Sequence, residues 1–272
     1  NSFDPVSMDT PELDPAFPPT NVELSIPSAG AKMPAYLMIA NGRGPHPTIV
    51  MLHGLPGNER NLDIAQSLRR AGFNVLYFNY RGAWGAEGNY RFSHLAADAG
   101  AVLGFLRLNA ADYRVDQLRL SVLGHSMGGF AALQAGAQDQ RLQCVMAMAA
   151  ANLGERAMLS QQELTGFSEY ADSLYMLNGF SGRLAVGDIM SNAERFDLAN
   201  LGPGLAGKAV LMITGNGDTV VPLAVQQRIA EAYAADPRIK LTALAIAGDH
   251  SFSQNRIELQ RIIVAYAAQR CR

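Results

Sequence analysis

A serine framed by glycines lies between two apolar runs, in the segment Gly124-His125-Ser126-Met127-Gly128. The run before it, Leu118–Leu123, is typical of a buried strand, and the run after it, Phe130–Gln138, is typical of a helix. A sharp turn from strand to helix favours glycine on both sides, because side chains there would clash. The pattern therefore predicts a strand, a tight turn and a helix, with the side chain of Ser126 lifted out of a sheet.

The same alternation of strand-like and helix-like runs extends along most of the chain. The expected strands are Val22–Ile26, Met33–Ile39, Thr48–Leu52, Asn74–Phe78, Leu118–Leu123, Leu142–Ala149, Lys208–Thr214 and Lys240–Ile246. The expected helices are Asn61–Arg70, Phe92–Leu108, Phe130–Gln138, Leu223–Ala235 and Arg256–Gln269. Apolar strands that alternate with helices indicate an α/β fold with a mostly parallel sheet and helices on both faces. The turn Pro27–Gly30 between the first two strands predicts an antiparallel start.

Two segments depart from this alternation. Residues 1–20 include five prolines between Asp4 and Pro19, and they are expected to form an extended arm. Such an arm is compatible with export after removal of a signal peptide, although the sequence contains none. Residues 150–207 carry helical patches and are expected to form a small helical cap over a cleft at the carboxyl ends of the strands. The core of the fold is then expected to comprise residues 21–149 and 208–272.

Composition excludes several classes of partner. The net charge is −2 and the sequence has no long basic block, so nucleic acid is not an expected partner. No apolar run approaches the roughly 18 uncharged residues that suggest a membrane span. Cys144 lies in an apolar run and Cys271 lies next to the C-terminus, and we expect one buried and one exposed thiol, unpaired. Their spacing indicates neither a disulfide framework nor a metal site.

A serine hydroxyl is a poor nucleophile unless a base removes its proton and an acid orients that base. The chain has five histidines, so the base can be sought by elimination. His46 is expected on a surface loop at the wrong end of a strand, and His94 is expected to be solvated at a helix start. His125 occupies the variable position of the serine turn, and His53 ends a strand close to the site. His250 follows the last strand on a loop that can reach the serine, which makes it the predicted base.

The acid is expected on a loop after an intervening strand. Asp218 follows the strand Lys208–Thr214 and is the predicted acid; the alternative for an aspartate there is to cap a turn or a helix. Asp249 is a competitor, but its adjacency to His250 makes the required hydrogen bond to the ring difficult. The predicted triad therefore has the chain order Ser126, Asp218, His250, which is the order of the nucleophile-elbow hydrolases.

A tetrahedral intermediate also needs hydrogen-bond donors for its oxyanion. One predicted donor is the backbone N–H of Met127, directly after the serine. The other is the N–H of Leu55, in the loop His53-Gly54-Leu55-Pro56-Gly57 that follows the third strand. Three further residues, His53, Trp84 and Tyr175, are candidates for contact with the substrate.

These segments resemble those of α/β-hydrolase-fold serine hydrolases, from about Val22 to the C-terminus. The segment Asn79-Tyr80-Arg81-Gly82 further resembles the corresponding loop of prolyl-oligopeptidase-like and dienelactone-hydrolase-like members. The resemblance implies an eight-stranded sheet and hydrolysis of an ester, amide or thioester through an acyl-enzyme. It implies no cofactor and no metal.

Departures from the family narrow the expected chemistry. Familiar dienelactone hydrolases have cysteine at the position of Ser126, and haloalkane dehalogenases and epoxide hydrolases have aspartate. Dipeptidyl-peptidase relatives bind the substrate amine with paired glutamates, and this chain has no Glu-Glu dipeptide. We therefore expect a small-molecule carboxylic ester as substrate, with a serine peptidase or amidase of the prolyl-oligopeptidase-like type as the alternative. A ligand-binding protein without catalysis is less favoured, because all three triad residues are present.

Overall fold

The computed structural model describes residues 3–272 and contains one eight-stranded sheet. Its strands are β1 (Thr20–Ser28), β2 (Ala31–Ile39), β3 (His46–Leu52), β4 (Asn74–Phe78), β5 (Val115–His125), β6 (Cys144–Met148), β7 (Ala209–Gly215) and β8 (Lys240–Ile246). They are ordered β1-β2-β4-β3-β5-β6-β7-β8. β2 runs antiparallel to β1 and β4, and the other neighbouring strands are parallel. The mostly parallel α/β sheet with an antiparallel start is confirmed.

Helices cover both faces of the sheet. Residues of α1 (Leu62–Arg70) and α9 (Arg256–Arg270) share a buried cluster with Ile49 of β3. Residues of α2 (Leu95–Leu108), α3 (Met127–Gln138) and α8 (Leu223–Ala234) share a second cluster with Val50, the next residue of the same strand. Because successive strand residues point to opposite faces, one apolar strand supplies both clusters.

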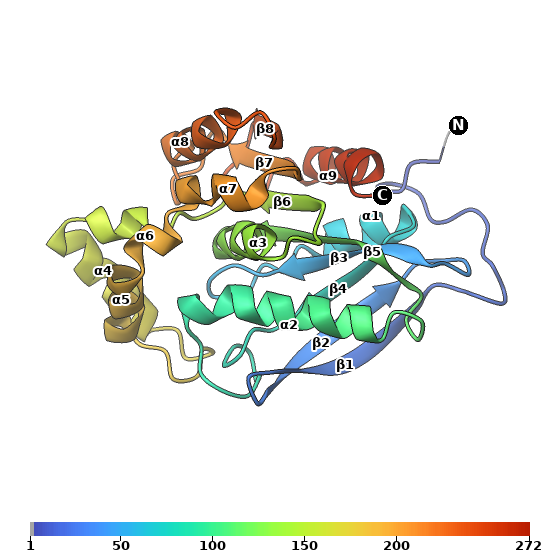
Figure 1. Ribbon diagram of the computed structural model, residues 1–272, viewed down its shortest axis with the longest axis horizontal. Coiled ribbons are helices and arrows are strands. Elements are labelled where there is room, and N and C mark those ends of the chain that lie inside the picture. The colour runs from blue at the N-terminus through green and yellow to red at the C-terminus, as the bar shows by residue number, and fades with distance from the viewer. Residues whose placement is uncertain (1–2) are drawn as a thin grey trace.

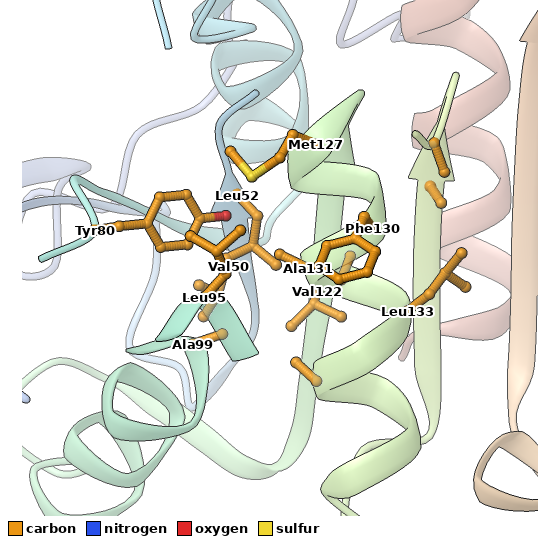
Figure 2. Close-up of a cluster of buried hydrophobic side chains, with 14 of the residues drawn as sticks. Val50, Leu52, Tyr80, Leu95, Ala99, Val122, Met127, Phe130, Ala131 and Leu133 are labelled. Carbon is orange, nitrogen blue, oxygen red and sulfur yellow. The ribbon is translucent and has the colours of Figure 1, made fainter. Parts of the chain in front are cut away.

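The second cluster fixes the position of α3. Val50 and Leu52 of β3 and Val122 of β5 pack against side chains of α2 and α3, and all of them are buried. Figure 2 shows this packing through Val50, Leu52, Leu95, Ala99, Val122, Phe130, Ala131 and Leu133. Close packing of this kind leaves little freedom for α3 to shift, so the residue just before α3 is held firmly relative to the sheet.

Two expectations about the region around β5 need correction. The strand extends beyond the expected Leu118–Leu123 at both ends, because it pairs with β3 from Val115 onward through an irregular stretch that leaves Leu118 exposed. His46 is not on a surface loop: it is buried as the first residue of β3, and its Nε2 donates to the carbonyl of Gly42 at 3.0 Å. The backbone pairing of His46 with Val115 draws it into the sheet.

Residues 150–207, which we call the cap segment, contain four α-helices and two short 3₁₀ helices. They are α4 (Gln161–Asp172), α5 (Gly182–Ser191), α6 (Ala193–Phe196) and α7 (Gly202–Leu205), with 3₁₀ turns at Glu155–Met158 and Leu198–Leu201. Figure 1 shows α4 and α5 at the end of the molecule away from α9 and the C-terminus. Leu174 and Leu177 of the cap segment are buried, whereas Tyr170 is exposed. That the segment closes over a cleft stays a prediction.

The cap segment is joined to the loop after β4 by backbone hydrogen bonds. Trp84 donates to the carbonyl of Met176 at 3.0 Å, and Asn178 donates to that of Gly82. The side chain of Phe167 also stacks near Phe92, with 6.4 Å between the ring centroids. Two regions that are distant in sequence are therefore held together beside the carboxyl ends of the strands.

The N-terminal arm lies along α1 and α9, on the face of the sheet that these two helices cover. Arg70 of α1 donates to the carbonyls of Pro5 and Val6, and Arg261 of α9 pairs with Asp4 at 3.0 Å. From residue 3 to Pro19 the arm joins no strand of the sheet. Within residues 3–272, none of the helices combines the length and apolar character that crossing a bilayer requires.

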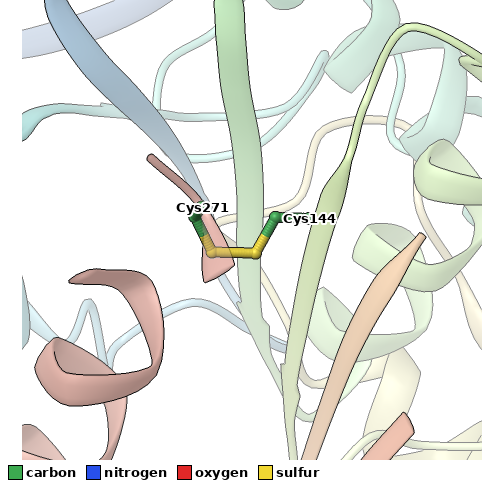
Figure 3. Close-up of a disulfide and its surroundings, with 2 residues drawn as sticks. All are labelled: Cys144 and Cys271. Atoms are coloured by element: carbon green, nitrogen blue, oxygen red, sulfur yellow. A yellow bond between two sulfur atoms is a disulfide. The ribbon is translucent and has the colours of Figure 1, made fainter. Parts of the chain in front are cut away.

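The expectation of two unpaired thiols is wrong. Cys144 and Cys271 form a disulfide that joins the first residue of β6 to the residue after α9, as Figure 3 shows. Cys271 is also buried rather than exposed. The two positions are 127 residues apart in sequence, but the packing of α9 on the sheet brings their Cα atoms to 5.3 Å. That is within the usual range for a disulfide of about 4.4–6.8 Å.

Candidate active site

The turn between β5 and α3 holds Ser126 in a conformation that few non-glycine residues adopt, with φ 58° and ψ −122°. Its neighbours explain why the turn is framed by glycine. A Cβ on Gly124 would overlap the carbonyl of Gly128, and a Cβ on Gly128 would overlap the carbonyl of Leu52. Ser126 N–H donates to the carbonyl of Met148 at 2.9 Å, which ties the turn to the adjacent strand. This is the predicted elbow, with its strained serine at the carboxyl end of the central strands.

Three residues from separate loops form a continuous chain of side-chain contacts. Nε2 of His250 lies 2.9 Å from Oγ of Ser126, and Nδ1 of His250 lies 2.7 Å from Oδ2 of Asp218. The Asp218 side chain is fully buried and the His250 side chain is 18% exposed. In the neutral ring, Nδ1–H donates to the carboxylate, and Nε2 is then free to accept the hydroxyl proton of the serine. The structure therefore brings together the three residues that the sequence singles out.

The carboxylate of Asp218 faces His250 and also caps its own turn, which is the other common use of an aspartate at such a position. While Oδ2 faces His250, Oδ1 accepts hydrogen bonds from the N–H groups of Val220 and Val221, both at 2.8 Å. The aspartate thus shapes its own turn and fixes its carboxylate plane toward the ring. Asp249, the competitor, instead accepts from the N–H groups of Ser251 and Ser253.

His125 contributes to the site in a way that the sequence does not reveal. Its ring is buried, and its Nε2–H donates to the backbone carbonyl of His250 at 2.7 Å. Burial, together with the nearby His250, lowers the pKa of His125 to about 4. The ring is therefore neutral at neutral pH, and it holds the backbone of the His250 loop close to the elbow. Nothing in the local sequence signals this contact, because its partner lies 125 residues away.

The loop from His53 to Gly57 lies directly against the elbow. A Cβ on Gly54 would stand 3.3 Å from Cβ of Ser126, so a larger residue there would press on the serine. Among residues 3–272, neither the N–H of Leu55 nor that of Met127 donates to another residue. Met127 is also the first residue of α3, where backbone N–H groups lack helical partners and the helix dipole favours negative charge.

Two of the candidate substrate contacts support this loop. The ring of His53 is buried, and its Nδ1–H donates to the carbonyl of Gly54 at 2.8 Å. Burial lowers the pKa of His53 to about 4, so the ring is neutral. Nε1–H of Trp84 donates to the carbonyl of Pro56 at 2.7 Å. Tyr175 is 91% exposed on the cap segment, and its contact with a substrate stays a prediction.

No metal site accompanies these groups within the described part of the chain. Residues 3–272 hold no cluster of three or more His, Cys, Asp and Glu side chains placed to bind a metal ion.

Comparison with known proteins identifies the family. The sequence model of Hydrolase_4, described as serine aminopeptidase S33, matches residues 43–200, more than half of the chain. The chain belongs to the Hydrolase_4 family. The matched segment includes the elbow and the loop before it, but it ends ahead of Asp218 and His250. The Hydrolase_4 match is consistent with the α/β-hydrolase fold described above.

A curated relative matches over a shorter stretch. An uncharacterized 31.7 kDa protein of Escherichia coli, from the traX-finO intergenic region, is 28% identical over 114 residues. The match covers 41% of this chain and 40% of the relative, so the chain spans less than half the length of that protein.

Solved structures share the fold at low identity. Est1E of Butyrivibrio proteoclasticus, solved with ferulic acid bound, is 18% identical with a TM-score of 0.70, over 91% of this chain and 98% of its own. An esterase of Pyrococcus furiosus is 18% identical with a TM-score of 0.65, over 97% and 100%. An acylaminoacyl peptidase of Pyrococcus horikoshii is 16% identical with a TM-score of 0.71, over 94% of this chain and 42% of its own. The α/β-hydrolase fold is thereby confirmed.

Proposed function

We propose that this Hydrolase_4 member is a serine hydrolase that cleaves carboxylic esters through an acyl-enzyme. The observation that carries the proposal is the unbroken contact chain from Asp218 through His250 to Ser126. Each of the three has the geometry and the chemical type that its role requires. Leu55 and Met127 are proposed to bind the oxyanion, since their N–H groups have no other partner among residues 3–272.

The proposed reaction has two halves. Oγ of Ser126 attacks the ester carbonyl while Nε2 of His250 takes its proton, and Asp218 holds the ring in the tautomer that permits this. The N–H groups of Leu55 and Met127 stabilise the negative charge that develops on the carbonyl oxygen. His250 then protonates the leaving alcohol. Water, activated by the same histidine, attacks the acyl-enzyme in the second half and releases the acid.

Cleavage of a peptide is the alternative, and two observations favour it. The family is described as a serine aminopeptidase, and an acylaminoacyl peptidase shares the fold. An aminopeptidase needs a carboxylate to hold the substrate's amine. Glu155 is the acidic residue in a cavity that borders the site, between the start of the cap segment and the loop after Asp218, and it is already paired with Arg228 at 2.5 Å. This pairing and the esterase neighbour support the ester as the preferred substrate.

The test compares the parent with Ser126→Ala on a short-chain 4-nitrophenyl ester and on a panel of aminoacyl 4-nitroanilides. Ser251→Ala is the matched control. Ser251 adjoins His250, and the hydrogen bond from its backbone N–H to the side chain of Asp249 is kept when the residue is alanine. We expect turnover of the ester by the parent and the control, with a loss in kcat of about 10⁴-fold or more for Ser126→Ala. Faster turnover of the anilides than of the ester would favour the peptidase. No turnover of any substrate, and no labelling by a fluorophosphonate, would favour a ligand-binding protein.

A further inference from the structure

A cavity of about 350 Å³ borders the proposed site between the start of the cap segment and the loop that follows Asp218. Its lining includes Ala151, Asn152, Glu155, Arg156 and Val221, and the remaining lining residues are apolar. Ala151 N–H donates to the carbonyl of Ser126 at 3.0 Å, and Val221 N–H donates to Asp218 at 2.8 Å. One wall of the cavity is thus bonded to the elbow and the other to the proposed acid.

Most of the lining is apolar, and two of its three polar side chains are already engaged. Asn152 donates to Asp197 and accepts from the N–H of Leu198. Glu155 is held by Arg228, which also binds Asp197 at 2.6 Å. Neither Asn152 nor Glu155 is therefore available to a ligand without breaking a contact that the fold already makes.

Arg156 is the third polar side chain, and it differs from the other two. Among residues 3–272 its guanidinium forms no ion pair and no side-chain hydrogen bond, and it stacks over the ring of Phe167 at 5.1 Å from the centroid. Burial lowers the pKa of Arg156, yet an arginine stays protonated at neutral pH. Arg156 is half-buried and has no ionic partner among residues 3–272, so it is the lining side chain that can pair with an anion.

We propose that this cavity receives a carboxylate-bearing group of the substrate, with Arg156 as the residue that binds the carboxylate. The inference rests on the proposed ester hydrolysis and names its substrate class: a small ester whose acyl or alcohol part ends in a carboxylate. Planar guanidinium groups bind carboxylates through two parallel hydrogen bonds, which lysine cannot reproduce. The volume lies at the lower end of the range of about 300–1,000 Å³ for ligand pockets, so the group is short.

The test uses two matched substrate pairs, one for each side of the scissile bond. For the acyl side, 4-nitrophenyl hydrogen glutarate is compared with its neutral methyl ester. For the alcohol side, 3-carboxyphenyl butyrate is compared with phenyl butyrate. We expect kcat/KM to be about tenfold or more higher for the carboxylate in one of the two pairs, since a hydrogen bond to a charged group contributes that much. The pair that shows the preference identifies the side of the ester that enters the cavity.

Variants assign the preference to Arg156. In Arg156→Met the ratio of kcat/KM between the charged and neutral substrates should fall to about one, and Arg156→Lys should retain part of it. Because each ratio is measured within one variant, a change in the folded fraction cancels. Arg183→Met is the control: Arg183 is exposed on α5, and the ratio should stay at the parent value.

Two results would overturn the inference while leaving the proposed function intact. One is equal kcat/KM within both pairs for the parent; the other is a preference that survives in Arg156→Met. Hydrolysis of the neutral esters by the parent separates these results from a failure of the proposed function itself. If the proposed function itself failed, neither member of either substrate pair would be cleaved.

Discussion

The elbow and the cap segment differ in how far they depend on the backbone. Around Ser126 the constraints act on the backbone: Gly124 and Gly128 are required because a Cβ would meet a carbonyl. The cap segment has such a position at Gly154, but it also depends on side-chain packing, such as that of Leu174 in the core. Backbone constraints leave few sequences that satisfy them, whereas packing accepts many. The chemistry should therefore be sensitive to single changes, and the exposed side chains of the cap segment tolerant of them.

The sharpest contrast comes from the proposed base. His250→Ala removes the group that accepts the serine proton, and kcat on the neutral ester should fall by about 10⁴-fold or more. The circular dichroism spectrum and the melting temperature should stay close to those of the parent, because the ring is partly exposed and lies on a loop. A variant that kept more than a tenth of the parent kcat would remove His250 from the mechanism.

The core should also respond to acid more strongly than the cap segment. His53 and His125 have pKa values of about 4 in the folded protein, below the unfolded value of 6.5. The unfolded chain then binds more protons between these values, so stability is full above pH 6.5 and falls as the pH drops toward 4.

Urea unfolding at pH 7 and pH 4.5 measures this loss. His125→Gln removes one titrating ring while keeping a side-chain N–H for the carbonyl of His250. It should lose less stability over this pH range than the parent does. The cap segment contains no histidine, so substitutions of its uncharged residues should leave the loss of stability between pH 7 and pH 4.5 unchanged. If His125→Gln lost as much stability between pH 7 and pH 4.5 as the parent does, the assignment of a neutral buried ring would be contradicted.

The disulfide fastens α9 to the sheet at the first residue of β6. Replacing Cys144 and Cys271 by alanine together should lower the free energy of unfolding by about 2–5 kcal/mol, since the unfolded chain gains freedom. Thermal unfolding of the variant and of the reduced parent should give the same, lower melting temperature. A melting temperature that does not change in either sample would mean that the link adds no stability.

The smallest effect is expected on the exposed surface of the cap segment. Tyr175→Ala should change the free energy of unfolding by less than about 0.5 kcal/mol, because the side chain makes little buried contact. Its kinetic effect decides the prediction that Tyr175 touches the substrate. A rise in KM with unchanged kcat would support that contact, and unchanged kcat and KM would remove it.

The sequence could predict the features that depend on the order of the strands, but not the contacts that depend on how distant segments pack. The order and spacing of Ser126, Asp218 and His250 are enough to predict that the three side chains meet, because each residue follows a strand whose place in the sheet is set by the fold. The pairing of Cys144 with Cys271 could not be predicted, because it depends on how α9 docks, and 127 residues separate the two. The contact of His125 with the His250 loop and the proposed role of Arg156 could not be predicted for a similar reason, because each depends on which groups face the side chain after folding.

The extent of β5 shows the limit within the core itself. Its apolar run, Leu118–Leu123, marks the buried half of the strand, but the remainder is set by backbone pairing with β3 and not by hydrophobicity. The local hydrophobic pattern indicates which residues are buried, but it does not show where a strand ends, because the strand that it pairs with lies elsewhere in the chain. The sequence therefore predicts the position of the strand correctly but makes the strand too short at both ends.

The central claim is that Ser126 forms the acyl-enzyme. Intact-mass spectrometry during early turnover of a slow 4-nitrophenyl ester, followed by peptide mapping, tests it most directly. The account predicts one acyl group per chain, located on the peptide that contains Ser126, and no adduct in Ser126→Ala. Stoichiometric acylation of another residue, or an equal adduct in Ser126→Ala, would contradict it.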